Sequence, residues 1–496
     1  MMPFDKPDVL LAGVAPEIAL AATALILLIA DAVFGKPGNR WFLSILSTIG
    51  LGISIYLALT GWFDLDGPRL QLAGMVAVDG FATFVKVTLA SFGLLTVWLS
   101  RDYLSRHNME EAEFYGLVLF AVAGMMLMAG AADLIMMFLA LETFSIALYV
   151  LVGFRRRSLE SQESAMKYFL LGAFSSAFFL LGIAFAYGAV GTTSLYGTAD
   201  APGIFSFVNS SPFESGGLLV IATGLLLVGL GFKVAAVPFH MWTPDAYQGA
   251  PSPVTGFMAA ATKLAGFAAV LRLLEVSLFP LRVEWRPLVI GVAVLTMVVG
   301  SVLAVVQEDL KRLLAYSSIA HAGFVFTGVI ATSDRGVSGA LFYLATYGLT
   351  VVGAFAIIAA LSGREERRVR ISDYRGLFDE HPLMAGALTL FLLSLAGVPL
   401  TSGFVGKLLV FGAAVEAGYS WLVVVGVLAS AIAAFFYLRV MVAMYMQERE
   451  EAAEPTRFGP LATGVVALTA AATVVFGLLW SPLIEVAEKA TFFAGG

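Results

Sequence analysis

Long apolar stretches separated by short polar connections run through almost all of the 496 residues. A helix needs about 20 mostly apolar residues to cross the hydrocarbon core of a membrane. Windows of that length predict fourteen transmembrane helices, over Leu10–Ala30, Trp41–Thr60, Gly80–Ser100, Phe114–Ala132, Leu134–Phe154, Ala165–Val190, Gly216–Val237, Thr255–Leu274, Pro287–Gln307, Leu313–Thr332, Ser338–Leu361, Leu383–Val415, Trp421–Met446 and Pro460–Leu483. The pattern therefore predicts an all-α, multi-pass integral membrane protein with no soluble domain.

Two of the apolar segments contain a proline at a matching place. Val237-Pro238 stands in the seventh segment and Val398-Pro399 in the twelfth. Proline removes a backbone donor and clashes with the preceding helical turn, and free backbone groups inside a membrane are tolerated only beside protein or a wet cavity. Interrupted helices at corresponding places in two halves of a chain indicate inverted repeats around a transport path. The pattern thus favours a transport protein.

The basic residues of the connections are distributed unequally between the two sides of the predicted membrane. Connections after odd-numbered helices hold sixteen of them, namely Lys36, Arg40, Arg101, Arg106, Arg155, Arg156, Arg157, Lys311, Arg312, Arg364, Arg367, Arg368, Arg370, Arg375, Arg449 and Arg457. The other side holds seven, namely Lys6, Arg69, Arg272, Arg282, Arg286, Arg335 and Lys489. Because cytoplasmic loops carry the excess of Lys and Arg, we expect both termini on the periplasmic side of a bacterial inner (plasma) membrane.

Composition narrows the chemistry that the chain can perform by itself. Hydrophobic residues make up 59% and charged residues 13% of the chain, and cysteine is absent, which excludes disulfides, thiolate zinc sites and cysteine-ligated iron–sulfur clusters. The net charge is −6 with scattered cations, so we expect no nucleic-acid partner. There is no Gly-x-Gly-x-x-Gly after a strand pattern, no Walker A string and no HExxH. We therefore expect no cofactor or metal in this chain and an energy source outside it.

Four charged residues lie well inside apolar helices: Glu142, Lys233, Lys263 and Lys407. A charge at the centre of a membrane helix costs on the order of 3 kcal/mol. Glu142 stands about two turns, or roughly 12 Å, into its helix, which is too deep for its carboxylate to reach the interface. One acid cannot neutralise three separate lysines, so structural ion pairing alone would leave buried cations unpaired.

Lysine suits proton handling because burial favours its neutral form and a nearby carboxylate favours its charged form. We hypothesise that Glu142 and Lys233 form a switchable pair and that Lys263 and Lys407 relay the proton along a hydrated axis. The alternative interpretation is that each charged side chain either belongs to a structural ion pair or extends along the helix until its charged end reaches the interface.

Two further residues are candidate members of the relay. His321 lies in an apolar helix close to Ser317 and Ser318, and histidine is the residue type whose ordinary pKa is near neutral, although a lone histidine in such a helix is more often a structural group. Lys167 lies three residues into its helix, close to the basic connection, so a side chain that reaches the interface is an equally open interpretation.

Other charges in or near the helices favour structural roles. For Lys86 and Arg439 a structural interpretation is preferred, and Glu17 stays unassigned. Asp133 precedes the fifth helix, where a carboxylate is favourable as a cap. The segment His240–Asp245 is interpreted as a turn after the broken helix and not as a site.

Several long strings resemble the antiporter-like membrane subunits of respiratory complex I. They are Phe232–Tyr247 (FKVAAVPFHMWTPDAY), Gly249–Thr255 (GAPSPVT), Leu310–His321 (LKRLLAYSSIAH) and Gly397–Lys407 (GVPLTSGFVGK). Within that family, the string from Glu163 to Ser176, a lysine at position 407 and the absence of a long lateral helix resemble the N-type subunit of the bacterial NADH:quinone oxidoreductase.

The resemblance implies two inverted five-helix repeats, formed by helices 4–8 and 9–13, with helices 7 and 12 broken. The expected division is 1–113 (three N-terminal helices), 114–275 (first repeat), 276–447 (second repeat) and 448–496 (C-terminal helix). It also implies that Glu142, Lys233, Lys263 and Lys407 form the central axis, with Lys167 as an additional N-type member.

The resemblance further implies a proton-translocating subunit without a redox centre of its own, driven by quinone reduction elsewhere in the complex. The implied partners are M-type and K-type membrane subunits, lipids, and a peripheral NADH-oxidising arm that holds FMN and iron–sulfur clusters. Two alternatives stay open: a subunit of a multisubunit cation/proton antiporter, and a passive structural subunit of the membrane arm.

Overall fold

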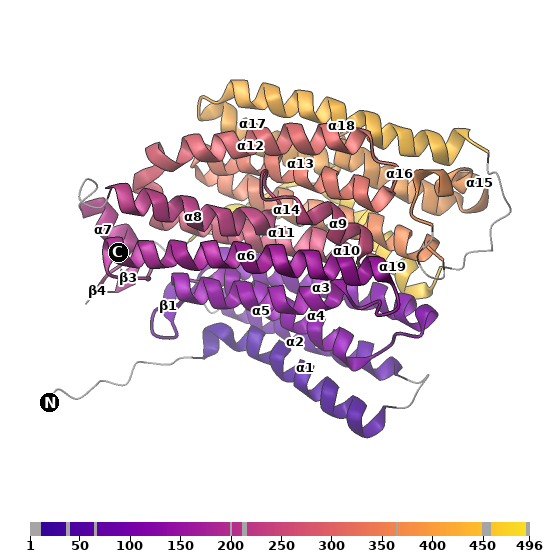
Figure 1. The fold of residues 1–496 in the computed structure, drawn as a ribbon, viewed down its shortest axis with the longest axis horizontal. Helices are drawn as coiled ribbons and strands as arrows, with labels where there is room; N and C mark the ends of the chain where they lie inside the picture. Colours follow the sequence, from indigo (N-terminus) through magenta and orange to yellow (C-terminus); the bar gives the residue numbers. More distant parts are fainter. Residues whose placement is uncertain are drawn as a thin grey trace.

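The computed structural model describes residues 11–35, 40–63, 67–198, 201–210, 216–363, 366, 368–448 and 458–492. The long helices run side by side, with the N-terminal helices along one edge of the molecule and α18 along the opposite edge (Figure 1). Of the basic residues counted above, Lys6, Lys36, Arg364, Arg367, Arg449 and Arg457 lie outside the described residues.

The first half of the bundle contains seven long helices. These are α1 (Ala15–Phe34), α2 (Trp41–Phe63), α3 (Gly80–His107), α4 (Ala112–Gly130), α5 (Leu134–Val152), α6 (Leu159–Val190) and α8 (Gly216–Val234). The shorter elements are η1 (Ala12–Val14), the ribbon of β1 (Arg69–Gln71) with β2 (Val76–Val78), the ribbon of β3 (Gly197–Thr198) with β4 (Ala201–Pro202), and α7 (Ile204–Ser210). Both ribbons lie in connections after even-numbered helices, and the apolar pattern did not predict them.

The eighth crossing is one continuous helical rod, Ser252–Ser277, in which α-helical and π-helical turns alternate. It consists of α10 (Ser252–Phe257), η2 (Met258–Thr262), α11 (Lys263–Arg272) and η3 (Leu273–Ser277). The apolar window predicted a start at Thr255, but Pro251 and Pro253 begin the helix earlier, since proline is compatible with the first turn. An 18-residue stretch of this rod is completely buried inside the bundle.

The remaining helices form the second half. They are η4 (Phe279–Leu281), α12 (Arg282–Val305), α13 (Leu310–Ala331), α14 (Asp334–Leu361), η6 (Ile371–Tyr374), α15 (Leu377–Glu380), α16 (Pro382–Ala396), α17 (Ser402–Glu416), α18 (Ser420–Met446), α19 (Pro460–Leu478) and α20 (Ser481–Glu488), whereas the short helix α9 (Trp242–Gly249) lies between α8 and the eighth crossing. Among the described residues, thirteen helical segments are long and apolar enough to cross a membrane. The pair α16 and α17 adds the interrupted crossing, which confirms the predicted count of fourteen.

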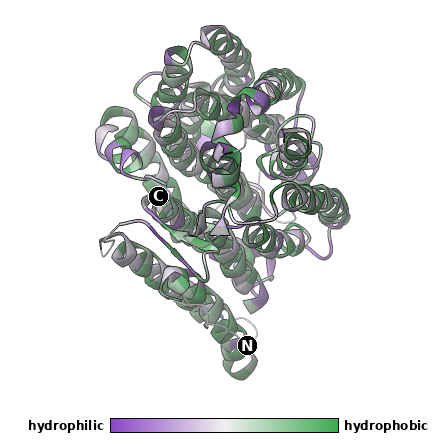
Figure 2. Ribbon diagram, turned by 90° about the vertical axis from the view of Figure 1, so that its left-hand side faces the viewer, coloured by the Kyte–Doolittle hydropathy of each residue, from purple (hydrophilic) through white to green (hydrophobic). Residues whose placement is uncertain are grey.

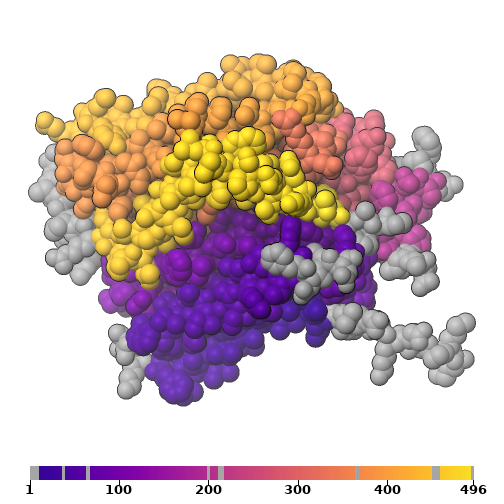
Figure 3. All heavy atoms as spheres, turned by 180° about the vertical axis from the view of Figure 1, so that it is seen from behind, coloured from indigo at the N-terminus to yellow at the C-terminus, as the bar shows by residue number. Residues whose placement is uncertain are grey.

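Apolar residues predominate in the outer helices of the bundle as well as in the inner ones (Figure 2). On α18, for example, Val424, Leu428 and Phe435 are exposed. Large exposed apolar side chains along whole helices are typical of a protein that lipid surrounds. The C-terminal segment lies across the bundle between the N-terminal helices and the second half (Figure 3), where α19 contacts α3, α14 and α16.

The structure confirms the breaks that the two prolines predicted. Helix α8 ends at Val234, three residues before the end of the predicted window, because Ala235 takes a left-handed conformation with φ of 61°. Helix α16 ends at Ala396, and Gly397 follows with φ of 87°. A left-handed residue after the last turn is a common way to end a helix. The freed Val237 N–H donates to Thr296 Oγ1 at 2.9 Å, so protein groups satisfy the backbone there, as a membrane requires.

Candidate functional site

Lys233 is enclosed by aromatic rings at the end of α8. Its ammonium lies 5.3–5.4 Å from the ring centres of Phe144, Tyr149, Tyr168 and Phe232. The residue is 2% exposed, and Nζ has no hydrogen-bond partner. Ring faces attract a cation only weakly compared with a carboxylate. Lys233 is therefore a buried basic group with neither a hydrogen bond nor an ion pair within 4.0 Å among the described residues.

Glu142 lies on α5, two residues before Phe144 and seven residues, or about two turns, before Tyr149. Its carboxylate accepts a hydrogen bond from Ser176 of α6. Glu142 and Lys233 do not approach within the 4.0 Å that defines an ion pair among the described residues. The structure thus brings the two proposed partners to one aromatic cluster without joining them.

Lys263 contacts the broken end of α8 from the neighbouring crossing. It is the first residue of α11, directly after the π-helical turn η2, and is 2% exposed. Its Nζ donates to the carbonyl oxygen of Val234, the last residue of α8, at 2.9 Å. The last carbonyls of a helix lack intrahelical partners and carry partial negative charge. The ammonium therefore caps the helix that carries Lys233.

Lys407 makes the corresponding contact at the second break. From α17, its Nζ donates to the carbonyl oxygens of Leu395 at 3.1 Å and Ala396 at 2.9 Å, at the end of α16. It also lies 2.6 Å from Ser430 Oγ of α18. A side chain at Gly397 would meet Lys407, since a Cβ there would lie 3.1 Å from Nζ. Glycine at this position thus leaves room for the ammonium.

His321 lies on α13, between the two breaks. Its Nδ1 is 2.7 Å from Tyr343 Oη and its Nε2 is 3.3 Å from Tyr437 Oη. A small pocket beside it, lined also by Ser394 of α16, has room for about one water molecule. One turn further along α13, the ring of Phe324 lies 4.8 Å from Lys407 Nζ. The histidine is therefore fully hydrogen-bonded and close to the second break.

The structure does not bring Lys167 to this buried group. Its side chain is 47% exposed and pairs with Glu163 at 2.6 Å and with Asp245 at 3.1 Å. Asp245 also pairs with Arg312 at 2.6 Å. Partial burial alone would raise the pKa of Asp245, but the hydrogen bonds from Arg312 and Lys167 outweigh it and lower that pKa. Lys167 thus belongs to an ionic network at the side of the basic connections.

Three other charges have the structural partners that their sequence context favours. Lys86 pairs with Glu17 at 2.7 Å, both buried, which gives a role to both residues. Arg439 donates to the carbonyl oxygen of Val305, at the end of α12. Asp133 caps α5 through the N–H of Ile135 at 2.7 Å, as predicted.

Sequence reasoning missed two buried ionic clusters, because it assigned their members to connections. Arg272 holds Asp79 through two hydrogen bonds of 2.8 and 3.0 Å, with both side chains fully buried. The second cluster joins Arg155, Lys311 and Glu366. Arg272 stands inside an apolar run, which was a usable signal. Glu366 lies among basic loop residues and gave none.

The charged and polar groups of the described residues do not form a metal site. No three His, Asp or Glu side chains in this part of the chain gather closely enough to hold a metal ion. The polar groups that meet at the two breaks are instead ammonium groups, hydroxyls and backbone carbonyls. Such groups can bind and pass protons, since ammonium and hydroxyl both donate and the neutral amine and hydroxyl both accept.

The sequence and the fold of this chain match those of a known class of membrane proteins. Residues 131–433 match the family described as NADH:quinone oxidoreductase/Mrp antiporter, TM. A chain of the respiratory complex I from Thermus thermophilus has 36% sequence identity and a TM-score of 0.79, covering 95% of this chain and 98% of that one. A chain of the Mrp complex from Dietzia sp. DQ12-45-1b shares the fold, with 21% identity, a TM-score of 0.83 and 96% of each chain covered. The chain belongs to the family of antiporter-like membrane subunits of NADH:quinone oxidoreductase and Mrp antiporters.

Its relatives narrow the assignment within that family. NADH-quinone oxidoreductase subunit N 1 of Solibacter usitatus is 42% identical over 478 residues, which cover 96% of each chain. Subunit N of Chloroflexus aggregans is 42% identical over 493 residues, covering 99% of each chain. The chain is thus of the subunit N type, a multi-pass membrane subunit of a multisubunit oxidoreductase complex.

Proposed function

We propose that this chain carries protons across the membrane through Glu142, Lys233, Lys263, His321 and Lys407, as the subunit N of a proton-pumping NADH:quinone oxidoreductase. The chain supplies the path, and quinone reduction in other subunits supplies the energy. Lys167, at the edge of the bundle, would take part at the boundary with a neighbouring subunit.

The observation that carries the proposal is the state of the three buried lysines. Lys233 has no polar partner, and Lys263 and Lys407 donate to carbonyls and a hydroxyl but to no carboxylate within 4.0 Å among the described residues. A buried ammonium without an anion is costly, and releasing the proton removes that cost. A structural role would not need three such groups in one chain.

The two breaks explain how the lysines could exchange protons. Each break exposes the last carbonyls of a helix, and an ammonium occupies them, from Lys263 at α8 and from Lys407 at α16. A neutral amine cannot donate three hydrogen bonds there, so gain or loss of a proton changes the attraction between the lysine and the helix end. Approach of Glu142 to Lys233 would favour the charged form of Lys233, and its withdrawal would favour release.

The surroundings of the chain follow from the same assignment. We place it in a bacterial inner membrane with the basic connections on the cytoplasmic side and both termini on the periplasmic side. M-type and K-type membrane subunits would be its neighbours. FMN, iron–sulfur clusters and the quinone would be bound by partner subunits. The relatives favour this assignment over a separate cation/proton antiporter, since those named are all subunit N of NADH-quinone oxidoreductase.

Substitution of Lys233 in the assembled complex tests the proposal. In sealed membrane vesicles, Lys233→Ala should abolish proton transfer through this chain, so that fewer protons are taken up per NADH oxidised, while the complex still assembles. The matched control is the double variant Glu17→Gln with Lys86→Met, which removes a buried ion pair between α1 and α3 and should leave the ratio unchanged. A wild-type ratio in Lys233→Ala would favour the passive structural subunit and refute the proposal.

A further inference from the structure

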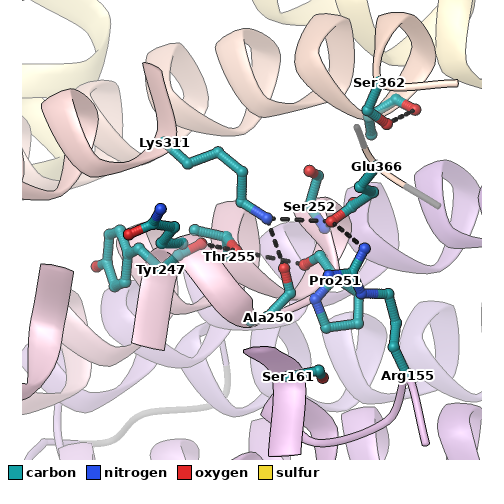
Figure 4. A network of polar contacts seen from close by, with 12 residues as sticks. Arg155, Ser161, Tyr247, Ala250, Pro251, Ser252, Thr255, Lys311, Ser362 and Glu366 are labelled. Carbon is teal, nitrogen blue, oxygen red and sulfur yellow. Dashed lines mark hydrogen bonds and ion pairs between the residues drawn. The ribbon is translucent and has the colours of Figure 1, made fainter. Parts of the chain in front are cut away.

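Glu366 is a buried carboxylate at which several segments meet (Figure 4). Its Oε2 lies 3.1 Å from Arg155 and 3.2 Å from Lys311, and its Oε1 accepts the N–H of Ser252 at 2.8 Å. Lys311 also donates to the carbonyl oxygen of Ala250 at 2.6 Å. The three charged side chains are at most 8% exposed. One anion thus holds two cations and one helix N-terminus in a buried site.

The partners of Glu366 come from the ends of the helices that carry the proposed proton path. Arg155 follows α5, which carries Glu142, and Ser252 begins the eighth crossing, which carries Lys263. Lys311 stands in the first turn of α13, which carries His321. Glu366 itself lies between α14 and the broken crossing of Lys407. The connections that follow the fifth, seventh, ninth and eleventh membrane crossings therefore meet at one carboxylate.

Backbone hydrogen bonds hold Val369 and Ile371, which follow Glu366 in the chain, at the start of α13. The N–H of Leu310 donates to the carbonyl oxygen of Val369 at 2.7 Å, and the N–H of Ile371 donates to that of Glu308 at 2.9 Å. A shift of this part of the chain would therefore move the start of α13 and, through Ser252, the start of the eighth crossing. The cluster at Glu366 joins the two predicted repeats, because Arg155 and Ser252 belong to the first repeat and Lys311 and Glu366 belong to the second.

Carboxylates hold the eighth crossing at both of its ends, through a backbone hydrogen bond at the first end and an ion pair near the second. Glu366 holds its first residue, and Asp79 holds Arg272 near its last turn. Between these ends lie Lys263 and the π-helical turn η2, a feature often found at functional sites. The crossing is therefore anchored at the ends and irregular in the middle, next to the lysine.

We propose that Glu366 is a positioning residue that keeps the four path-bearing helices in register at one side of the membrane, so that the two halves of the path act together. This inference rests on the proposed function. Stability alone does not account for the cluster, because buried ion triads are often no more stabilising than apolar groups of the same volume. A fixed relative placement of segments is what such a cluster can provide.

The test compares three variants of the assembled complex in sealed vesicles. Glu366→Gln alone removes the carboxylate from two buried cations and is expected to destabilise the chain. The double variant Glu366→Gln with Lys311→Gln keeps the net charge of the cluster and leaves one buried cation, Arg155, which still donates to Ser158 Oγ at 3.3 Å. We therefore expect it to lose less stability than Glu366→Gln alone. Glu366→Asp keeps the anion and serves as the conservative variant. The double variant at Glu17 and Lys86 is the matched control for loss of a buried ion pair elsewhere.

Per assembled complex, we expect the Glu366/Lys311 double variant to reduce the number of protons taken up per NADH oxidised by at least half of the reduction that Lys233→Ala causes. Glu366→Asp should restore most of the ratio, and the Glu17/Lys86 control should keep it. A wild-type ratio in the Glu366/Lys311 variant, with Lys233→Ala inactive in pumping, would overturn this inference alone. A wild-type ratio in Lys233→Ala would instead overturn the proposed function. A loss that follows only the amount of assembled complex would also overturn the positioning role.

Discussion

The ammonium of Lys263 lies 2.9 Å from the carbonyl oxygen of Val234, the residue at which the seventh crossing breaks. Lys407 stands in the same relationship to Ala396, also at 2.9 Å, at the break of the twelfth. Both lysines are therefore placed where a change of their charge alters the attraction to a helix end. This relationship connects a protonation event to a backbone element that can move.

Lys407→Arg separates proton handling from a fixed positive charge. Arginine keeps the charge and the hydrogen-bonding capacity, but it does not lose its proton in proteins. We expect Lys407→Arg to assemble normally and to pump as poorly as Lys407→Met, measured as protons taken up per NADH oxidised in sealed vesicles. Wild-type pumping in the arginine variant would show that the charge at the helix end is structural.

The same substitution should have opposite effects on stability at two buried lysines. No carboxylate lies within 4.0 Å of the Lys233 ammonium among the described residues, so Lys233→Met is expected to raise the free energy of unfolding by about 1 kcal/mol or more. Lys86→Met leaves the buried Glu17 unpaired and is expected to lower it by about 3–5 kcal/mol. Thermal melting of the purified complex measures both. Equal destabilisation by the two variants would contradict the view that Lys233 is kept for function at a cost in stability.

His321 can be tested by a substitution that preserves its polarity. His321→Gln retains a donor and an acceptor for Tyr343 and Tyr437 but cannot carry a proton near neutral pH. We expect proton transfer through this chain to slow by about 100-fold, while Tyr437→Phe costs only about 1 kcal/mol of stability. The rate is measured from proton uptake after a pulse of NADH. An unchanged rate in His321→Gln would leave the histidine a structural role.

The carboxyl group of Glu366 should not take up a proton in the physiological pH range. Burial alone would raise the pKa of Glu366, but Lys311 and Arg155 outweigh it and lower that pKa to about 2. A lowered carboxyl pKa contributes stability that is complete above the unfolded value of about 4.3 and is lost as pH falls towards 2. The difference in melting temperature between wild type and the Glu366/Lys311 double variant should therefore stay constant from about pH 7 down to about pH 5. A difference that shrinks over that interval would mean that the carboxylate takes up a proton there.

Much of this architecture could be predicted from local sequence. Apolar windows indicated the fourteen crossings, and the prolines at 238 and 399 indicated the two breaks, because both signals depend only on neighbouring residues. The charges of Glu142, Lys233, Lys263 and Lys407 stood out for the same reason, since a charge within an apolar run is visible without a fold. The predicted division into repeats, and the roles of these residues, stay predictions until the variants are measured.

Tertiary structure alone decided which groups meet. The sequence determined that charges would be buried, because lipid-crossing segments leave them no water. It did not determine that Ser252 and Glu366, 114 residues apart, would share a hydrogen bond, or that Lys263 would reach the end of α8 while Lys167 would not reach Lys233. Such contacts depend on how helices pack and where loops return, and a pattern with a period of a few residues carries no information on either. The membrane fold could thus be predicted from the local sequence, whereas the partner of each buried charge was decided only by the tertiary structure.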